Sequence, residues 1–329
     1  MADKQRATTH PSKKIRVGVI GTGNIAEKHL EVVKSFDDVE IAALCNSGHP
    51  RIHDCADRFG VGPRFTEYRK FLDEADIDAV FVLVSVLRIV EVTRECLSRG
   101  IPTLVEKPPG LSVGDAEALA TAASANNCLN MVALNRRFYS VMQRAREEIL
   151  AVGPLVSMTV EAPERIADYQ AVGHPPEVIQ NILFANGIHC IDLFRYFGGE
   201  VAAVESSARQ WFADQNDSFN ALLRFENGAT GHYLSNWTSP ARWSVTLYGR
   251  DRRIALCPLE HATVFESDGR QFDLPVDEVD RIYKPGIYAQ ARYFIDCVKE
   301  GRKPTYPAAD LVDAVKTMRL IELIQGDSR

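Results

Sequence analysis

The stretch Ile15-Arg-Val-Gly-Val-Ile-Gly-Thr-Gly-Asn-Ile-Ala-Glu-Lys-His29 decides the fold, because a short apolar strand breaks into a glycine turn and passes directly into a helix. Gly21 permits a tight turn, Gly23 lets bare backbone approach a pyrophosphate, and Ala26 takes the small position where helix and strand pack closely. The N-terminus of the helix offers free N–H groups to phosphate. We therefore assign dinucleotide binding to Gly21, Gly23, Asn24 and Ile25.

The segments after this turn distinguish a cofactor-binding fold from an ordinary glycine-rich turn, which has the same local pattern. Strands are predicted at residues 39–45, 78–84 and 102–105, with helical segments such as 90–99 between them. Their nearly continuous apolar character suits a parallel sheet that is covered on both faces. The first part of the chain is therefore predicted to be α/β, a Rossmann doubly wound parallel sheet whose ligands bind beyond the carboxyl ends of the strands.

The sequence changes character near residue 130, where a last strand at 129–134 and a linking helix at 140–150 are predicted. One helix at 188–196 and a helical tail at 290–324 accompany the strands that follow. Asn227-Gly228 is typical of a hairpin connection. These features predict an α+β domain with a large, mostly antiparallel open sheet. Its candidate strands are residues 155–162, 201–211, 219–225, 229–237, 243–248 and 253–257.

Length and composition favour two domains, since 329 residues with 46% hydrophobic residues bury a sizeable core. We expect a flexible tail at 1–14, a dinucleotide-binding domain at 15–135, and a substrate-binding and oligomerisation domain at 136–329. A net charge of −6 and a pI near 5.8 argue against a nucleic-acid surface. The longest apolar run, at 79–87, is shorter than the roughly 20 residues that a membrane-spanning helix needs.

The cysteines favour a reducing compartment. Seven of them are scattered without a C-x-x-C pair, and an odd number cannot form a complete set of internal disulfides. We therefore expect a cytoplasmic protein, and we expect no metal site, no nucleic-acid partner and no membrane partner.

Four segments together resemble the Gfo/Idh/MocA family of NAD(P)-dependent oxidoreductases, and the resemblance covers nearly everything after residue 14. It implies an N-terminal Rossmann domain, a C-terminal open sheet that often forms subunit contacts, and hydride transfer to or from a sugar or cyclitol. A homodimer or homotetramer formed through that sheet is the expected assembly. The segments are Gly21-Thr-Gly-Asn-Ile-Ala-Glu-Lys-His29, Val105-Glu-Lys-Pro108, Gly187-Ile-His-Cys-Ile-Asp192 with Phe194-Arg195, and Phe294-Ile-Asp-Cys-Val-Lys-Glu-Gly301.

Lys107 and His189 are the candidate catalytic residues, since alcohol oxidation needs a base that accepts the hydroxyl proton. Lys107 follows a strand end in Glu-Lys-Pro, and desolvation beside an oxidised nicotinamide would lower its pKa. His189 titrates near neutrality, and Asp192, three residues later on the same helix face, is expected to fix its tautomer. A surface lysine, a core histidine capped by Asp192, and an Asp192–Arg195 pair are the alternatives.

One departure from the family pattern lies just before the histidine. Many members carry an aspartate in D-x-G-x-H that shares the proton transfer with the lysine, whereas this segment reads Ala185-Asn-Gly-Ile-His189. Asn186 can donate and accept hydrogen bonds but is no base at neutral pH, so its expected role is supporting. Either His189 or Lys107 carries the proton alone, or the substrate class differs, or catalysis has been lost.

The end of the second predicted strand bears on the choice of cofactor. An acidic residue there would bind the adenosine ribose and repel a 2′-phosphate, but the sequence has Asn46, Ser47 and Arg51 instead. We therefore expect NADP, with NAD bound through Asn46 as the alternative. A second departure from the family pattern lies at 84–89, and the Ser85 hydroxyl is the one cofactor contact expected from that loop. The remaining predicted cofactor contacts are Ser85, Glu106 and Lys107.

A basic and aromatic segment, Asn135-Arg-Arg-Phe-Tyr139, follows the last predicted strand of the first domain. Its guanidinium groups favour an anionic or hydroxyl-rich ligand, although adjacent arginines diverge, so at least one is expected to be structural. For four further aromatic residues, Tyr169, His174, Trp237 and Trp243, packing is the favoured interpretation. The predicted substrate contacts are Arg136, Arg137, Tyr139, Asn186 and His189.

The predicted function is NAD(P)-dependent hydride transfer at a hydroxyl carbon of a sugar, cyclitol or nucleotide-sugar. Two alternatives use the same fold. A catalytically silent cofactor-binding regulator would explain Ala185, although the retained Lys107 and His189 argue against it. A glycoside hydrolase that uses NAD transiently is the other, and nothing in the chain singles it out.

Overall fold

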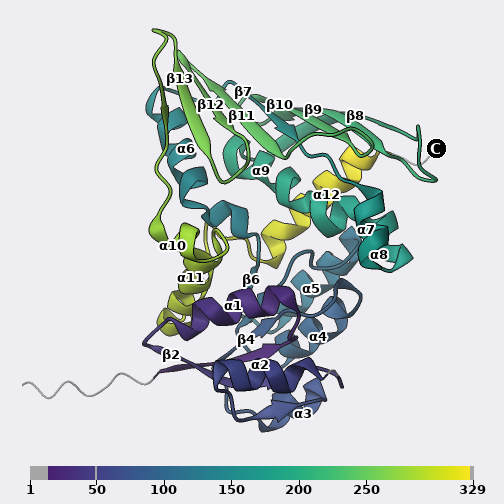
Figure 1. The fold of residues 1–329 in the computed structure, drawn as a ribbon, viewed down its shortest axis with the longest axis vertical. Helices are drawn as coiled ribbons and strands as arrows, with labels where there is room; N and C mark the ends of the chain where they lie inside the picture. Colours follow the sequence, from purple (N-terminus) through teal and green to yellow (C-terminus); the bar gives the residue numbers. More distant parts are fainter. Residues whose placement is uncertain (1–13, 49, 327–329) are drawn as a thin grey trace, which may run out of the picture.

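A computed structural model describes residues 14–48 and 50–326, which form two β-sheets and the helices around them (Figure 1). Of the predicted tail at 1–14, all but Lys14 lies outside the described residues. No helix in the described part of the chain combines the length and the apolar character that crossing a bilayer requires.

The first sheet has six parallel strands in the order β3-β2-β1-β4-β5-β6, which confirms the predicted Rossmann fold. The strand order reverses between β1 and β4, so their carboxyl ends form the crevice where ligands of such sheets bind. The strands are β1 (Ile15–Ile20), β2 (Val39–Cys45), β3 (Arg64–Phe65), β4 (Ala79–Val82), β5 (Thr103–Val105) and β6 (Asn130–Val132). The helices between them are α1 (Asn24–Lys34), α2 (Arg51–Phe59), α3 (Tyr68–Glu74), α4 (Val86–Ser98) and α5 (Val113–Ala125).

The second sheet has eight strands in the order β14-β13-β12-β11-β7-β10-β9-β8, and every neighbouring pair except β7–β10 is antiparallel. Alternate residues along β9 and β10 are buried, so one face packs on the core. The predicted hairpin joins β9 to β10 through Gly228, whose φ of +88° suits glycine. The strands are β7 (Ser157–Glu161), β8 (Val201–Arg209), β9 (Ser218–Phe225), β10 (Thr230–Asn236), β11 (Ser244–Gly249), β12 (Arg252–Leu256), β13 (Ala262–Glu266) and β14 (Gln271–Asp273), the last two of which were not predicted.

Helices fill the space between the two sheets (Figure 1). All residues of α9 are buried, which agrees with its place in the shared core. Short helices connect the longer ones, including a 3₁₀ turn, η1, and one π-helical turn, η2. The elements are η1 (Asn135–Phe138), α6 (Ser140–Ala151), α7 (Ile166–Val172), α8 (Pro176–Gln180), η2 (Leu183–Gly187), α9 (Ile188–Gly198) and α10 (Glu278–Ile282).

The predicted helical tail is not continuous. It divides into α11 (Ile287–Glu300) and α12 (Leu311–Gln325), because Gly301 ends α11 with a left-handed φ of +63° and two prolines follow in 301–310. Helix α11 lies beside α1 and packs Phe294 into the core of the first sheet, whereas α12 packs on α5 and β8 (Figure 1). The end of the chain therefore returns to both sheets, and the domain boundary at residue 135 stays a prediction.

Candidate active site

A cavity of about 380 Å³ lies at the carboxyl ends of β1, β2 and β4, and we call it the glycine-turn cavity. Six of the residues predicted to bind the cofactor line it, namely Gly21, Gly23, Asn46, Ser47, Arg51 and Ser85. Of the others, Asn24 accepts a hydrogen bond from Arg51 at 3.5 Å, and Ile25, Glu106 and Lys107 line a second cavity instead. The predicted set thus divides between two adjacent spaces.

The turn at the start of α1 fits a pyrophosphate. Gly21 has a φ of +108°, and a Cβ there would lie 2.3 Å from the carbonyl oxygen of Leu83, so only glycine fits. At Gly23 a Cβ would meet no atom within 4 Å, so the backbone borders open space at the first turn of the helix. The buried Thr22 hydroxyl has no hydrogen-bond partner among the described residues. These groups would hold a phosphate oxygen at the positive end of an eleven-residue helix.

One acidic residue lines the glycine-turn cavity, and sequence reasoning missed it. Glu67 follows β3, a strand of only two residues that the apolar pattern did not reveal. Burial raises the pKa of the Cys45 thiol, and the charge of the Glu67 carboxylate raises it further. The cavity therefore contains both a carboxylate and the Arg51 guanidinium.

A second cavity, of about 290 Å³, brings together the two residues predicted to exchange a proton. We call it the lysine cavity. Lys107 reaches it from the loop after β5, in the first sheet, and His189 from the start of α9, a helix that packs on the second sheet. Its lining residues are Ile25, His29, Glu106, Lys107, Ala133, Asn135, Arg136, Asn186, His189, Lys284, Ile287 and Gln290.

A third, outer cavity of about 610 Å³ connects the other two through shared lining residues. It shares Ser85 with the glycine-turn cavity, and Lys107 and Asn186 with the lysine cavity. Tyr169 and His174 form part of its wall, with their rings 5.3 Å apart. The three spaces therefore adjoin one another near the carboxyl ends of the strands of the first sheet.

The environment of Lys107 lowers the pKa of its amine. Its Nζ donates a hydrogen bond to the carbonyl oxygen of Ala185 at 3.0 Å. Burial lowers the pKa of Lys107 to about 8, and the charges of Arg136 and Lys284 act in the same direction, against Glu106. A lysine with this pKa is partly neutral near pH 8, so it can accept a proton there.

His189 is held as a neutral imidazole. It is only 7% exposed, and burial, followed by the charges of Arg136 and Lys107, lowers its pKa well below the usual value. Its Nδ1 has no hydrogen-bond partner among the described residues. A neutral ring in this cavity can donate one hydrogen bond and accept another.

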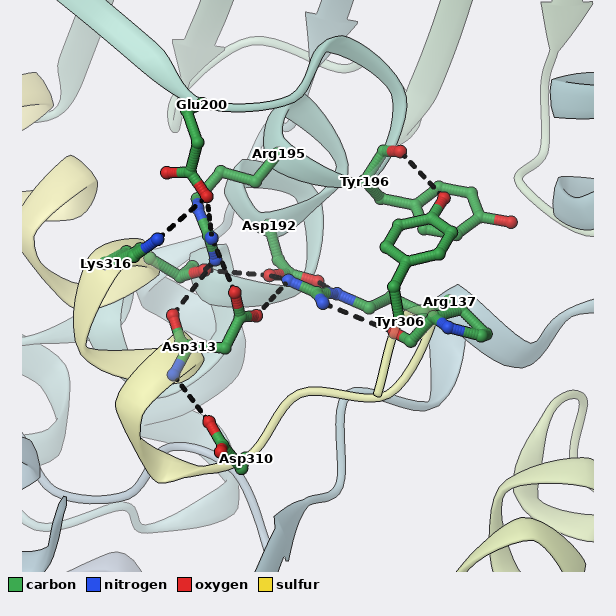
Figure 2. Close-up of polar contacts among 11 residues, drawn as sticks. Arg137, Asp192, Arg195, Tyr196, Glu200, Tyr306, Asp310, Asp313 and Lys316 are labelled. Carbon is green, nitrogen blue, oxygen red and sulfur yellow. Dashed lines mark hydrogen bonds and ion pairs between the residues drawn. The ribbon is translucent and has the colours of Figure 1, made fainter. Parts of the chain in front are cut away.

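The prediction that Asp192 fixes the tautomer of His189 is wrong. Both carboxylate oxygens of Asp192 accept hydrogen bonds from Arg137 at 2.6 Å, and one also accepts from Thr317 at 2.8 Å (Figure 2). The alternative pair with Arg195 is also absent from the described contacts, since Arg195 donates to Asp313. Asp192 faces a buried cation because an unpaired carboxylate in the core would be costly.

The two adjacent arginines diverge, as expected, and Arg137 is the structural one. It is 3% exposed and pairs with Asp192 and Asp313, which corrects its predicted role in substrate binding (Figure 2). Arg136 points into the lysine cavity, with its guanidinium 4.8 Å from the centre of the Trp243 ring. The arginines separate because η1 turns one side chain to the core and the other to the lysine cavity.

Tyr139 also requires correction as a substrate contact. It is buried and lines none of the three cavities, and its ring is so close to Gly286 that a Cβ there would lie 2.8 Å away. Trp237 is buried against Phe219, 5.0 Å between ring centres, which agrees with the packing interpretation. Trp243 instead stacks on Arg136, and since Arg136 lines the lysine cavity, the Trp243 ring lies near that cavity.

Besides Glu67, sequence reasoning missed two further charged residues of the site. Glu164 is 6% exposed and accepts hydrogen bonds from the Asn186 amide at 3.1 and 3.2 Å and from the Tyr169 hydroxyl at 2.9 Å. Burial raises its pKa to about 7, although these hydrogen bonds oppose the rise. Lys284, in the loop between α10 and α11, lines the lysine cavity from its exposed rim. The position of Glu164 just after a strand was a usable signal, whereas Lys284 had none.

Comparisons with known proteins agree with this architecture. Residues 15–134 match the model of an oxidoreductase family with an NAD-binding Rossmann fold, and residues 152–255 match the Gfo/Idh/MocA C-terminal domain. A 4-carboxy-2-hydroxymuconate-6-semialdehyde dehydrogenase of Sphingobium sp. is 25% identical over 94% of this chain and 98% of its own length. The myo-inositol 2-dehydrogenase of Thermotoga maritima is 24% identical over 90% of this chain and 92% of its own.

A solved structure has the same fold. It is an oxidoreductase from Agrobacterium radiobacter in complex with NAD+, L-tartaric acid and magnesium, which superimposes with a TM-score of 0.80 at 19% identity, over 94% of both chains.

The fold, the glycine turn and the family matches define an NAD(P)-dependent dehydrogenase or reductase that acts on CH–OH groups. The chain belongs to the Gfo/Idh/MocA family of oxidoreductases.

Proposed function

We propose that the protein transfers a hydride between the nicotinamide of NAD(P) and a hydroxyl carbon of a sugar, cyclitol or nucleotide-sugar. The observation that carries the proposal is that Lys107 and His189 line one cavity, and that the outer cavity shares lining residues with both this cavity and the glycine-turn cavity. The names of relatives support the substrate class, since they include dehydrogenases of myo-inositol and D-apiose.

The chain's own residues handle the proton. When bound, the nicotinamide supplies the hydride acceptor or donor of the reaction. The neutral amine of Lys107 accepts the hydroxyl proton, and its hydrogen bond to the Ala185 carbonyl fixes the direction of its lone pair. The neutral His189 ring holds the same hydroxyl by a hydrogen bond. Asn186 supports this arrangement with its carbonyl oxygen, because Glu164 accepts from its amide nitrogen.

For the cofactor we propose a preference for NADP over NAD. Asn46 stands at the end of β2 where an acidic residue would repel a 2′-phosphate, and the Arg51 guanidinium lines the same cavity. Glu67 lies in the same cavity and supports the NAD alternative, because its carboxylate can accept a hydrogen bond from a ribose hydroxyl.

We further propose that the protein works in the reducing cytoplasm as a homodimer or homotetramer, assembled through the second sheet. Strands β10 and β11 present Leu234 and Tyr248 on the face away from the core, where they are exposed. Light scattering of the purified protein should give a mass of two or four subunits, and a monomer at micromolar concentration contradicts the assembly.

The test of the function is a substrate screen. The purified protein, given NADP or NAD with cyclitols, aldoses and nucleotide-sugars, should change the absorbance of the nicotinamide band with at least one of them. A catalytically silent regulator is the second candidate, since Ala185 stands where relatives carry a carboxylate. Cofactor binding without turnover across the whole screen favours that candidate and contradicts ours.

A further inference from the structure

We propose that the substrate is a hydroxy acid, a sugar acid with one carboxylate, which Arg136 and Lys284 bind in the lysine cavity. This inference rests on the proposed function and names the substrate class of the same site.

Basic side chains from three separate elements converge on this one cavity. Lys107 comes from the end of β5, Arg136 from η1, and Lys284 from the loop before α11. Within residues 14–48 and 50–326, none of the three lies within 4 Å of a carboxylate oxygen. Partial desolvation of its ammonium, followed by the Arg136 charge, lowers the pKa of Lys284, so these two cations repel one another across the space. A cavity of this kind stabilises a bound anion.

The contrast with the neighbouring arginine shows that Arg136 is available. Arg137, one residue later, is held by two carboxylates, whereas the hydrogen bond that Arg136 donates is to Asn135 Oδ1 at 3.4 Å. The Nε of Arg136 is buried and has no hydrogen-bond partner among the described residues. Stacking on Trp243 at 4.8 Å holds the guanidinium plane in one orientation, which leaves its edge for a planar carboxylate.

The charge of the cavity matches a monoanion. In the state that accepts the substrate proton, Lys107 is neutral and so is His189, which leaves Arg136 and Lys284 as cations against the single carboxylate of Glu106. The balance is one positive charge, which one carboxylate neutralises. A phosphate dianion would exceed it.

Hydroxyl groups of the same ligand also have partners there. The amide nitrogen of Asn186 is committed to Glu164, so its carbonyl oxygen is the atom left to accept a hydrogen bond from a substrate hydroxyl. The ring of His189 lines the same cavity and, as a neutral imidazole, offers one nitrogen as a second acceptor. A sugar acid requires acceptors for its hydroxyl groups next to cations for its carboxylate, and this cavity has both.

The experiment compares matched ligands by calorimetry, using the full chain saturated with reduced cofactor so that binding is read without turnover. Glucuronate and glucose differ only in carboxylate against hydroxymethyl at one carbon, as do galacturonate and galactose, and glucose 6-phosphate tests the phosphate alternative. We expect at least one acid to bind roughly tenfold or more tightly than its neutral partner. We expect Lys284→Met, which changes an exposed residue, to remove most of that difference, and Lys70→Met on α3 to preserve it.

Equal affinities within both pairs, tighter binding of glucose 6-phosphate than of either acid, or a preference that survives both Lys284→Met and Arg136→Met would overturn the proposal. The nicotinamide absorbance assay separates the two hypotheses. Turnover of neutral sugars with no preference for acids contradicts the hydroxy acid and leaves the dehydrogenase function. Selective binding of acids without turnover of any substrate contradicts the function and leaves the anion site.

Discussion

The ammonium of Lys107 donates a hydrogen bond of 3.0 Å to the main-chain carbonyl of Ala185, although 78 residues separate them in the sequence. The contact joins the end of β5 to η2, and therefore ties the Rossmann sheet to the helices under the second sheet. In the family pattern the position of Ala185 carries an aspartate. In this protein the main-chain carbonyl at that position accepts a hydrogen bond from the lysine, and the Ala185 side chain supplies no negative charge that would raise the pKa of Lys107.

We expect the rate of alcohol oxidation to follow the titration of Lys107. Because the neutral amine is the acceptor, kcat/KM should rise as the pH increases through about 8 and level off above it. Lys107→Met should lower kcat by roughly 10²- to 10⁴-fold and leave the dissociation constant of the reduced cofactor within about threefold. Steady-state kinetics from pH 6 to 10 measure the first effect and fluorescence titration the second. Normal turnover by this variant would exclude Lys107 as the proton acceptor.

Arg136 and Arg137 should respond differently to the same substitution. Arg137→Met leaves the buried Asp192 uncompensated, so we expect a loss of about 3–5 kcal/mol in the free energy of unfolding. Arg136→Met should cost less than about 1 kcal/mol of stability but weaken substrate binding. Urea denaturation measures the free energy of unfolding of each variant. If the two variants unfold at the same urea concentration, the assignment of one structural and one ligand-binding arginine is wrong.

Arg51 should decide the choice between the two cofactors. It lines the glycine-turn cavity close to Asn24, and a guanidinium there would bind a 2′-phosphate through charge-assisted hydrogen bonds. Arg51→Ala is expected to weaken NADP binding by roughly tenfold and NAD binding by less than about twofold. Fluorescence titration with both reduced cofactors checks this. Equal losses for the two cofactors contradict the proposed preference for NADP.

Glu164 should make the protein less stable as the pH rises. Its pKa in the folded protein is about 7, above the usual 4.5, so the folded state binds the proton more tightly than the unfolded chain does. Stability from this group is therefore complete below about pH 4.5 and is lost as the pH rises toward 7. The loss amounts to roughly 1–3 kcal/mol at pH 8.

Glu164→Gln tests this, since glutamine keeps the shape of the side chain without the charge. We expect the free energy of unfolding of this variant to increase relative to that of the wild type between pH 5 and pH 8. Urea denaturation at each pH measures this difference. Asp168→Asn, an exposed carboxylate on the neighbouring helix α7, is the matched control and should show no such gain. A constant difference between wild type and Glu164→Gln across this range would rule out the raised pKa.

Much of the fold was predictable because its signals are local. The boundaries of β2 agree with the prediction, and the hairpin at Gly228 is confirmed, since apolar alternation and a positive φ depend on few neighbouring residues. The break in the C-terminal helix at Gly301 was missed, because apolar periodicity continues on both sides of it. Strand β3 was missed for the opposite reason, since two residues show no periodicity.

The sequence by itself determined the Rossmann turn, the antiparallel second sheet, and the presence of a lysine and a histidine suited to proton exchange, because these depend on glycine conformation, apolar spacing and intrinsic side-chain chemistry. Tertiary structure alone decided which charges meet. Asp192 lies on the same helix as His189 but binds Arg137, because a buried carboxylate is stabilised by the nearest desolvated cation rather than by its sequence neighbours. Glu164 and Lys284 likewise enter the site only when distant segments fold together.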